Sequence, residues 1–156
     1  MNLMAVVADW MLAKERLVGS VVVPVRFVNH EDEILASRNL LPLDDVRAVS
    51  IPDVLVDTGA TTLCLPIDII RKLGVPKKRD VLGRTPTGEG SLELYRDVTI
   101  DVLGRSYTSE CIALREGATP LLGCLPLEAM GLEPDLAHRA LRLLPETGDS
   151  TFWLVY

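Results

Sequence analysis

The sequence predicts a mainly β fold, organised as one domain over its 156 residues. Two observations carry the prediction. From Val49 to Leu114, short runs of alternating apolar and polar residues are separated by turns that contain glycine, which is the pattern of half-buried strands. Helical signals are short, and the two clearest, near 66–73 and 126–130, each stop at a glycine. A chain of this size is long enough to bury a core of its own.

The composition restricts the class of protein and of partner. Apolar residues make up 48% of the chain and charged residues 24%, which excludes a disordered acidic chain. A net charge of −6 argues against a nucleic-acid partner or an anionic membrane surface. Charges break the apolar runs near the N-terminus well short of the ~20 residues of a spanning helix, and no signal-peptide pattern opens the chain. We therefore expect no membrane partner and a cytoplasmic location.

Cysteine and histidine, the commonest ligands of zinc sites, are few. The three cysteines, Cys64, Cys111 and Cys124, are odd in number and lie beside apolar residues, which is typical of reduced, mostly buried thiols in a reducing compartment. His30 and His138 lack ligand spacing with each other or with the cysteines, so they are interpreted as surface residues. We expect neither a metal nor another cofactor, and metal-dependent hydrolysis is the weakest of the functional alternatives.

The elements ahead of residue 57 can be assigned in order. Residues 1–17 form an N-terminal extension with helical spacing, interpreted as a small docked helix. Strands are expected over 21–28 and 49–56, and each contains a proline that should mark an edge or a bulge. The charged, weakly periodic residues 30–48 between them are interpreted as a surface insertion in the form of a solvated loop.

The elements after residue 57 begin with the helix at 66–73. The basic residues 77–79 that follow it are interpreted as a solvated turn. A hairpin with a glycine-rich, polar tip is expected over 81–96. The C-terminal tail, 145–156, ends in apolar residues and should be covered by another surface. Three further strands are expected between hairpin and tail: 98–102, 107–114 and 140–144.

The most informative stretch is Asp57-Thr58-Gly59-Ala60, which directly follows three apolar residues. A carboxylate at the end of an apolar strand is costly unless it is hydrogen-bonded or takes part in chemistry. The simplest interpretation is a β-turn in which Asp57 accepts backbone N–H groups from Gly59 and its neighbours. The longer string, with an apolar strand on either side, closely resembles the catalytic loop of the retropepsin-like aspartic proteases. Further along the chain, Leu121-Leu122-Gly123 resembles the second landmark of that family, two apolar residues before a glycine.

This resemblance implies the acid protease fold, a closed β-barrel with two quasi-twofold halves, one Asp-Thr-Gly per subunit and two short helices. It also implies an aspartic endopeptidase, in which two carboxylates share one proton and activate a water molecule. The chain has a single Asp-Thr-Gly, so the second carboxylate must come from an identical chain across a twofold axis. The expected partners are a second copy, with the tail at 145–156 in the dimer interface, and a peptide or protein substrate.

The family motif also assigns roles around Asp57. The Thr58 hydroxyl would bond across the dimer, Gly59 would present its backbone to the substrate, and Ala60 would leave room beside the carboxylates. Gly123 would support the catalytic loop. The hairpin tip would be the flap that closes over the substrate, with four candidate substrate-binding residues: Thr87, Gly88, Glu89 and Gly90. A non-proteolytic dimerisation or binding module with the same fold stays open as the alternative.

Overall fold

A computed structural model describes residues 20–144. The expectations for the extension at 1–17 and for the tail at 145–156 therefore lie outside the described residues. Within the part of the chain that is described, no helix is long and apolar enough to cross a membrane.

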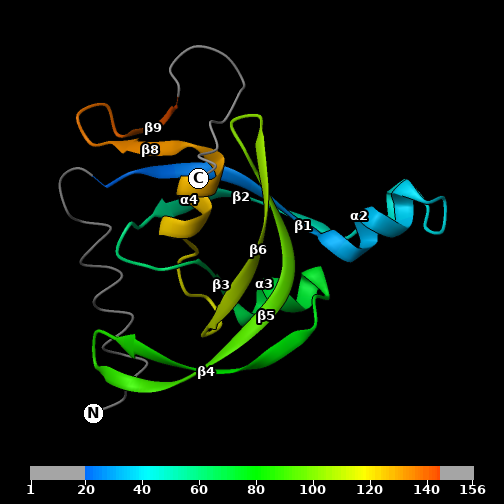
Figure 1. Cartoon of the computed structure of the whole chain (residues 1–156), viewed down its shortest axis with the longest axis horizontal. Coiled ribbons are helices and arrows are strands. Elements are labelled where there is room, and N and C mark those ends of the chain that lie inside the picture. The colour runs from blue at the N-terminus through cyan, green and yellow to red at the C-terminus, as the bar shows by residue number, and fades with distance from the viewer. Residues whose placement is uncertain (1–19, 145–156) are drawn as a thin grey trace, which may run out of the picture.

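Strands dominate the described residues, so the predicted mainly β class is confirmed (Figure 1). The strands are β1 Val22–Asn29, β2 Ala48–Val56, β3 Leu63–Pro66, β4 Lys77–Thr85, β5 Gly88–Val102, β6 Arg105–Leu114, β7 Leu121–Leu122, β8 Leu132–Asp135 and β9 Ala140–Leu143. The helices are α2 His30–Ser37, α3 Ile67–Leu73 and α4 Cys124–Met130, with one 3-10 turn, η1 Leu43–Asp45.

The main sheet closes on itself. Its strand order is β1-β2-β7-β3-β6-β5-β4, and an additional pairing joins β1 to β5. Six strands therefore form a ring, and β4 lies outside it as the partner of the first half of β5 (Figure 1). The second half of β5 pairs with β1. Strands β8 and β9 form a separate two-stranded sheet. The expected closed sheet thus takes the form of a ring with an outlying hairpin.

Alternation along the strands fills the ring with apolar side chains. Along β1, exposed and buried residues alternate up to Phe27, which is fully buried. Val98 and Ile100 on β5 are also fully buried and belong to the same core cluster, together with Leu63 and Leu65 of β3. Burying a side chain of this kind stabilises the fold by about 1.5–3 kcal/mol. The apolar positions of the alternating pattern in the sequence are therefore the positions that form this core.

The two strand prolines lie at one irregularity. The β1–β2 register shifts between Val23 and Val25, an interval that contains Pro24, and the facing residues on β2 skip Pro52. Proline has no N–H to donate to a ladder, so it fits where the ladder is interrupted. The predicted bulge is confirmed on both strands.

The two predicted short helices are confirmed as α3 and α4. Helix α4 begins two residues earlier than expected, at Cys124. Both helices end at a glycine with a left-handed backbone, Gly74 with φ 66° and Gly131 with φ 62°. That conformation is strained for residues with a Cβ, which explains why a glycine stops each helix.

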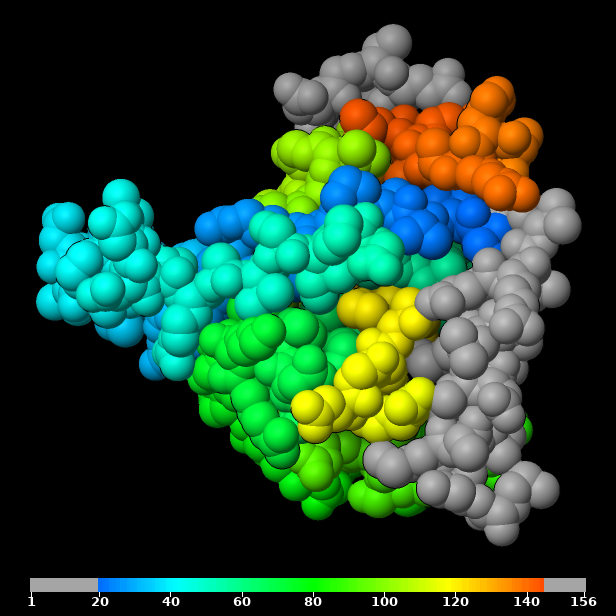
Figure 2. All heavy atoms as spheres, turned by 180° about the vertical axis from the view of Figure 1, so that it is seen from behind, coloured from blue at the N-terminus to red at the C-terminus, as the bar shows by residue number. Residues whose placement is uncertain are grey.

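The interpretation of 30–48 as a solvated loop is wrong. The segment forms α2 and η1, which project from the body as the arm, defined here as residues 30–47 (Figure 2, cyan). Asn29 caps α2 by accepting a hydrogen bond from the Asp32 backbone N–H at 3.0 Å. Asp32 is buried and accepts three hydrogen bonds from Arg47, from the backbone N, Nε and Nη2 at 3.0, 2.8 and 3.0 Å. A buried, paired carboxylate holds the base of the arm in one conformation.

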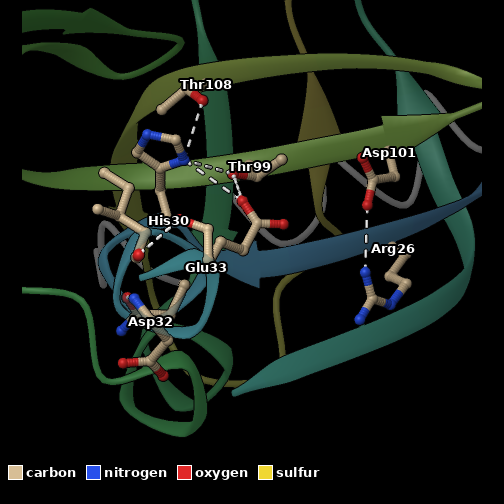
Figure 3. A network of polar contacts seen from close by, with 10 residues as sticks. Arg26, His30, Asp32, Glu33, Thr99, Asp101 and Thr108 are labelled. Atoms are coloured by element: carbon tan, nitrogen blue, oxygen red, sulfur yellow. Dashed lines mark hydrogen bonds and ion pairs between the residues drawn. The ribbon is translucent and has the colours of Figure 1, made fainter. Parts of the chain in front are cut away.

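Two further interpretations need correction. The basic residues 77–79 are not a turn but the exposed start of β4, where Lys77 pairs with Asp80 and Lys78 with Glu110. His30 is not a simple surface residue. Its ring is half-buried at the start of α2, with Nδ1 3.1 Å from the Thr99 hydroxyl (Figure 3).

The Asp32–Arg47 pair predicts an acid-dependent loss of stability. Hydrogen bonds from the Arg47 side chain lower the pKa of Asp32 in the folded state, against a smaller opposing effect of burial. Because the folded pKa is depressed, this stabilisation is present above the ordinary carboxyl pKa and is lost as pH falls through the folded value. We expect Asp32→Asn to lower the free energy of unfolding by roughly 1–3 kcal/mol at neutral pH.

Urea unfolding across a pH series checks this expectation. The difference between wild type and Asp32→Asn should shrink as pH drops below about 4. Asp44→Asn, an exposed carboxylate on the same arm with no ion pair to a described residue, is the matched control and should have little effect. Equal stability of wild type and Asp32→Asn at pH 7 would contradict the anchoring role.

Candidate active site

Strand β2 delivers Asp57 into the interior. Its last three residues, Val54, Leu55 and Val56, are all buried, and Asp57 is only 3% exposed. The Asp57 Oδ1 atom accepts a hydrogen bond from the Gly59 N–H at 2.9 Å, and the Ala60 N–H donates to the Asp57 carbonyl at 3.0 Å. The expected tight turn is therefore present. It fixes the carboxylate at the end of a rigid strand.

Strand β7 brings the second landmark beside the first. It runs parallel to β2, with Leu122 opposite Val56, so Gly123 lies at the position that corresponds to Asp57. The Asp57 N–H donates to the Leu122 carbonyl at 3.0 Å. In return, the Cys124 N–H donates to the Ala60 carbonyl at 2.8 Å. Backbone hydrogen bonds in both directions thus hold the 57–62 loop against the start of α4.

Gly123 is required by close packing of backbone. A Cβ added there would overlap the Thr62 carbonyl oxygen and would lie 2.7 Å from the Ala60 carbonyl oxygen. Both obstacles are main-chain atoms, so no side-chain movement can relieve the contact. The close approach explains why a glycine stands at 123, whereas the predicted role of Gly123 in supporting an active site stays a prediction.

A pocket of about 590 Å³ opens beside Asp57. The 57–62 loop contributes a carboxylate and backbone, and residues of the β4–β5 hairpin form another part of the lining. Most of the remaining lining is apolar. The lining residues are Asp57 and 59–62 of the loop, Cys64, 81–86 of the hairpin, Leu92, Ile112, Leu114 and Leu121. Such a pocket, apolar with a single buried acid, is the usual form of a small-molecule or peptide site.

The predicted site residues do not all reach this pocket. Asp57, Gly59 and Ala60 line it, whereas Thr58 is exposed and does not. The four candidate flap residues, 87–90, lie at the turn of the hairpin and at the start of β5, away from the lining. The hairpin itself is present, and its wall on the pocket is formed by 81–86. The substrate-binding role of the flap residues stays a prediction.

Sequence reasoning missed several lining residues. Thr61, Thr62 and Cys64 follow the motif directly, and Thr62 is fixed by a 3.2 Å contact between its hydroxyl and that of Ser109 on β6. The apolar residues from Leu63 onward predicted a strand, but they did not predict which of its side chains face the pocket. Ile112 on β6 enters because β3 pairs parallel with β6, a long-range pairing that no local pattern records.

Cys64 borders the pocket, but its surroundings disfavour the thiolate. Burial, with a smaller effect from the nearby Asp57 charge, raises the pKa of the Cys64 thiol to about 12. Burial also raises the pKa of Cys111. Because the thiolate is the reactive species, both thiols should be inert at neutral pH.

Alkylation tests the state of the cysteines. With iodoacetamide at pH 8 under native conditions, we expect mass spectrometry to find Cys64 and Cys111 unmodified and only the half-buried Cys124 slowly labelled. All three should react in denaturant. Labelling of native Cys64 at the denatured rate would contradict its burial.

Neither histidine belongs to the pocket. His30 lies with Glu33 and Thr99 at the base of the arm, and His138 pairs with Asp135 at 2.7 Å on an exposed turn before β9 (Figure 3 for His30). Among residues 20–144, no three His, Cys, Asp or Glu side chains are grouped so that they could hold a metal ion.

Comparison with known proteins gives a likeness of fold. No protein-family model matches the chain, and no curated protein matches it. Among solved structures, it is similar to the EIAV protease complexed with the inhibitor HBY-793, with 21% identity and a TM-score of 0.46. The match covers 74% of this chain and 92% of that chain. At this identity and TM-score the likeness carries no information about activity.

Proposed function

We propose that the chain is an aspartic endopeptidase, which hydrolyses peptide bonds through a water molecule activated by the paired Asp57 carboxylates of a homodimer. One observation carries this proposal. The Asp57 carboxylate ends a buried strand, is held by the Gly59 N–H, and faces a largely apolar pocket walled by a hairpin. A carboxylate of this kind needs either a structural reason or a chemical one, and its position on the pocket favours chemistry.

The second carboxylate has no source within residues 20–144. Asp57 is the only acid among the described residues that line the pocket. The place that the sheet register offers for a second one is Gly123, where even a Cβ would overlap the catalytic loop. A dyad therefore requires a second copy of the chain, with the two catalytic loops meeting on a twofold axis.

The chemistry follows from two carboxylates that share one proton. One accepts a proton from the attacking water, while the other donates its proton to the carbonyl oxygen of the scissile bond. Like charges so close together cannot both ionise, so the pair titrates in two separate steps. In this arrangement Thr58 stiffens the paired loops across the dimer, Gly59 presents backbone to the substrate, and Ala60 leaves space.

The β4–β5 hairpin supplies the closing element. Leu82 on β4 lines the pocket and is 91% exposed, a large apolar side chain that the other described residues leave uncovered. A bound peptide and the partner copy would bury it. Thr87 to Gly90 at the tip would then approach the substrate, with Gly88, whose φ is 129°, allowing the turn.

Cleavage of a randomised peptide library tests the proposed function. We expect peptide fragments to form. Pepstatin should block their formation, and metal chelators should have no effect on it. A binding module of the same fold would bind peptides without cleaving them. Absence of cleavage by purified dimer, across acidic and neutral pH, would overturn the enzyme proposal and leave the binding module.

A further inference from the structure

The arm carries an apolar surface that the fold does not cover. Leu40 is 70% exposed and Leu43 is 81% exposed, and both border a second pocket, of about 670 Å³, between the arm and β1. Figure 2 shows the arm standing away from the body, so its tip is open to another molecule. Large apolar side chains grouped on a protruding element are typical of interaction sites.

The two charged residues that line this pocket, Arg26 and Glu33, already have partners. Arg26 pairs with Asp101 at 3.2 Å, and Glu33 accepts a hydrogen bond from the Thr99 hydroxyl at 2.7 Å, beside His30 (Figure 3). The rest of the lining is mostly aliphatic, with Val28, Ala36, Leu41 and Val46 among it. What enters the pocket should therefore be apolar.

The arm beside the pocket is mostly acidic. The arm contains five acidic residues and two arginines. One of the arginines, Arg47, is taken by Asp32. Asp44 and Asp45 beside Leu43 are exposed and form no ion pair with any residue of the described part of the chain. Unpaired carboxylates next to an exposed leucine favour a partner that brings basic side chains to the same place.

We propose that the arm is a docking site for a peptide segment of another protein, one that places apolar side chains against Leu40 and Leu43 and lysines or arginines against Asp44 and Asp45. The site is separate from the Asp57 pocket and does not depend on the proposed catalysis. The arm would recruit a partner or a substrate protein through a surface distinct from the proposed cleavage site at Asp57.

A second copy of this chain fits the arm poorly. A second copy would have to bring basic side chains to Asp44 and Asp45, and the chain has 16 Lys and Arg residues against 22 Asp and Glu residues. Two of the three consecutive basic residues at the start of β4 already form ion pairs within the chain: Lys77 pairs with Asp80, and Lys78 pairs with Glu110. A basic partner meets neither obstacle.

Peptide display identifies the chemistry that the arm selects. A randomised 12-residue phage library is selected on full-length Asp57→Asn protein, which prevents cleavage. Binders are removed by counter-selection on the same protein carrying Leu40→Ser and Leu43→Ser. Peptides that bind the Asp57 pocket are lost in that step, since the counter-selecting protein retains that pocket. We expect the survivors to combine large apolar residues with lysine or arginine.

Fluorescence anisotropy with synthetic versions of the selected peptides then measures the dissociation constant of each peptide for each variant. We expect binding to weaken at least tenfold with Leu40→Ser/Leu43→Ser, several-fold with Asp44→Asn/Asp45→Asn, and further at high salt. Leu136→Ser, which changes an exposed leucine between β8 and β9, away from both pockets, should have no effect. Unchanged thermal unfolding of each variant excludes misfolding.

Three results would overturn the proposal. The first is that no peptide distinguishes the intact arm from the double serine variant. The second is a set of acidic or uncharged survivors, indifferent to Asp44 and Asp45. The third is sedimentation showing self-association that the double serine variant abolishes, which would make the occupant a second copy.

Discussion

Asp57→Asn should abolish peptide cleavage while leaving the fold intact. Asparagine has the same size and keeps an Oδ1 that accepts the Gly59 N–H, so the turn at the end of β2 is preserved. The amide cannot act as a base or share the dyad proton. We expect kcat/KM to fall by about 10³-fold or more, the scale of a lost general acid–base group. Initial rates on a fluorogenic peptide measure the effect.

The neighbouring Asp53 provides the matched control. It lies on β2, the strand that Asp57 directly follows, but it is exposed. Asp53→Asn should retain full activity, and both variants should unfold at nearly the wild-type temperature. Full activity in purified Asp57→Asn would remove this residue from the mechanism.

Gly123→Ala should produce the largest loss of stability of any single methyl addition near the site. The new Cβ would overlap the Thr62 carbonyl oxygen, and the 57–62 loop would have to move. Overpacking of this kind costs about 1–3 kcal/mol, and backbone obstacles place the expected value at the upper end. Because the same loop carries Asp57, activity should fall along with stability. Chemical denaturation and the peptide assay, run together, measure both effects.

Gly90→Ala is the control for Gly123→Ala. A Cβ added at Gly90 would meet no atom within 4 Å, so its effect on stability should be small. If Gly123→Ala unfolded at the wild-type denaturant concentration, the packing of the loop against β7 would be wrong.

The part of the site that the sequence predicted is the part with local signals. Asp57 and its turn follow from three apolar residues running into Asp-Thr-Gly, and Gly123 follows from a similar string. The bulge between β1 and β2 could be predicted from the two prolines, because the missing N–H is a property of the residue itself. Helices α3 and α4 ended where a glycine supplied the left-handed cap.

The parts that were missed depend on contacts between distant residues. The arm looked like a loop because its order rests on Asp32 meeting Arg47, a pair that charge composition alone does not distinguish from solvated charges. The start of β4 looked like a basic turn for the same reason, since the partner of Lys78 is Glu110 on β6, which is distant in the sequence. Leu114 and Leu121 line the pocket through strand pairing rather than through any motif.

Subunit mixing tests the central claim, that Asp57 acts in pairs, most directly. Wild type and Asp57→Asn are mixed in equal amounts and left until subunits exchange. Random pairing leaves about a quarter of the dimers with two wild-type chains and about half with one. The mixed dimers should be inactive, so total activity should fall to roughly half that of the same amount of wild type alone. Activity that stays at the wild-type level, with exchange verified by native mass spectrometry, would contradict the paired mechanism.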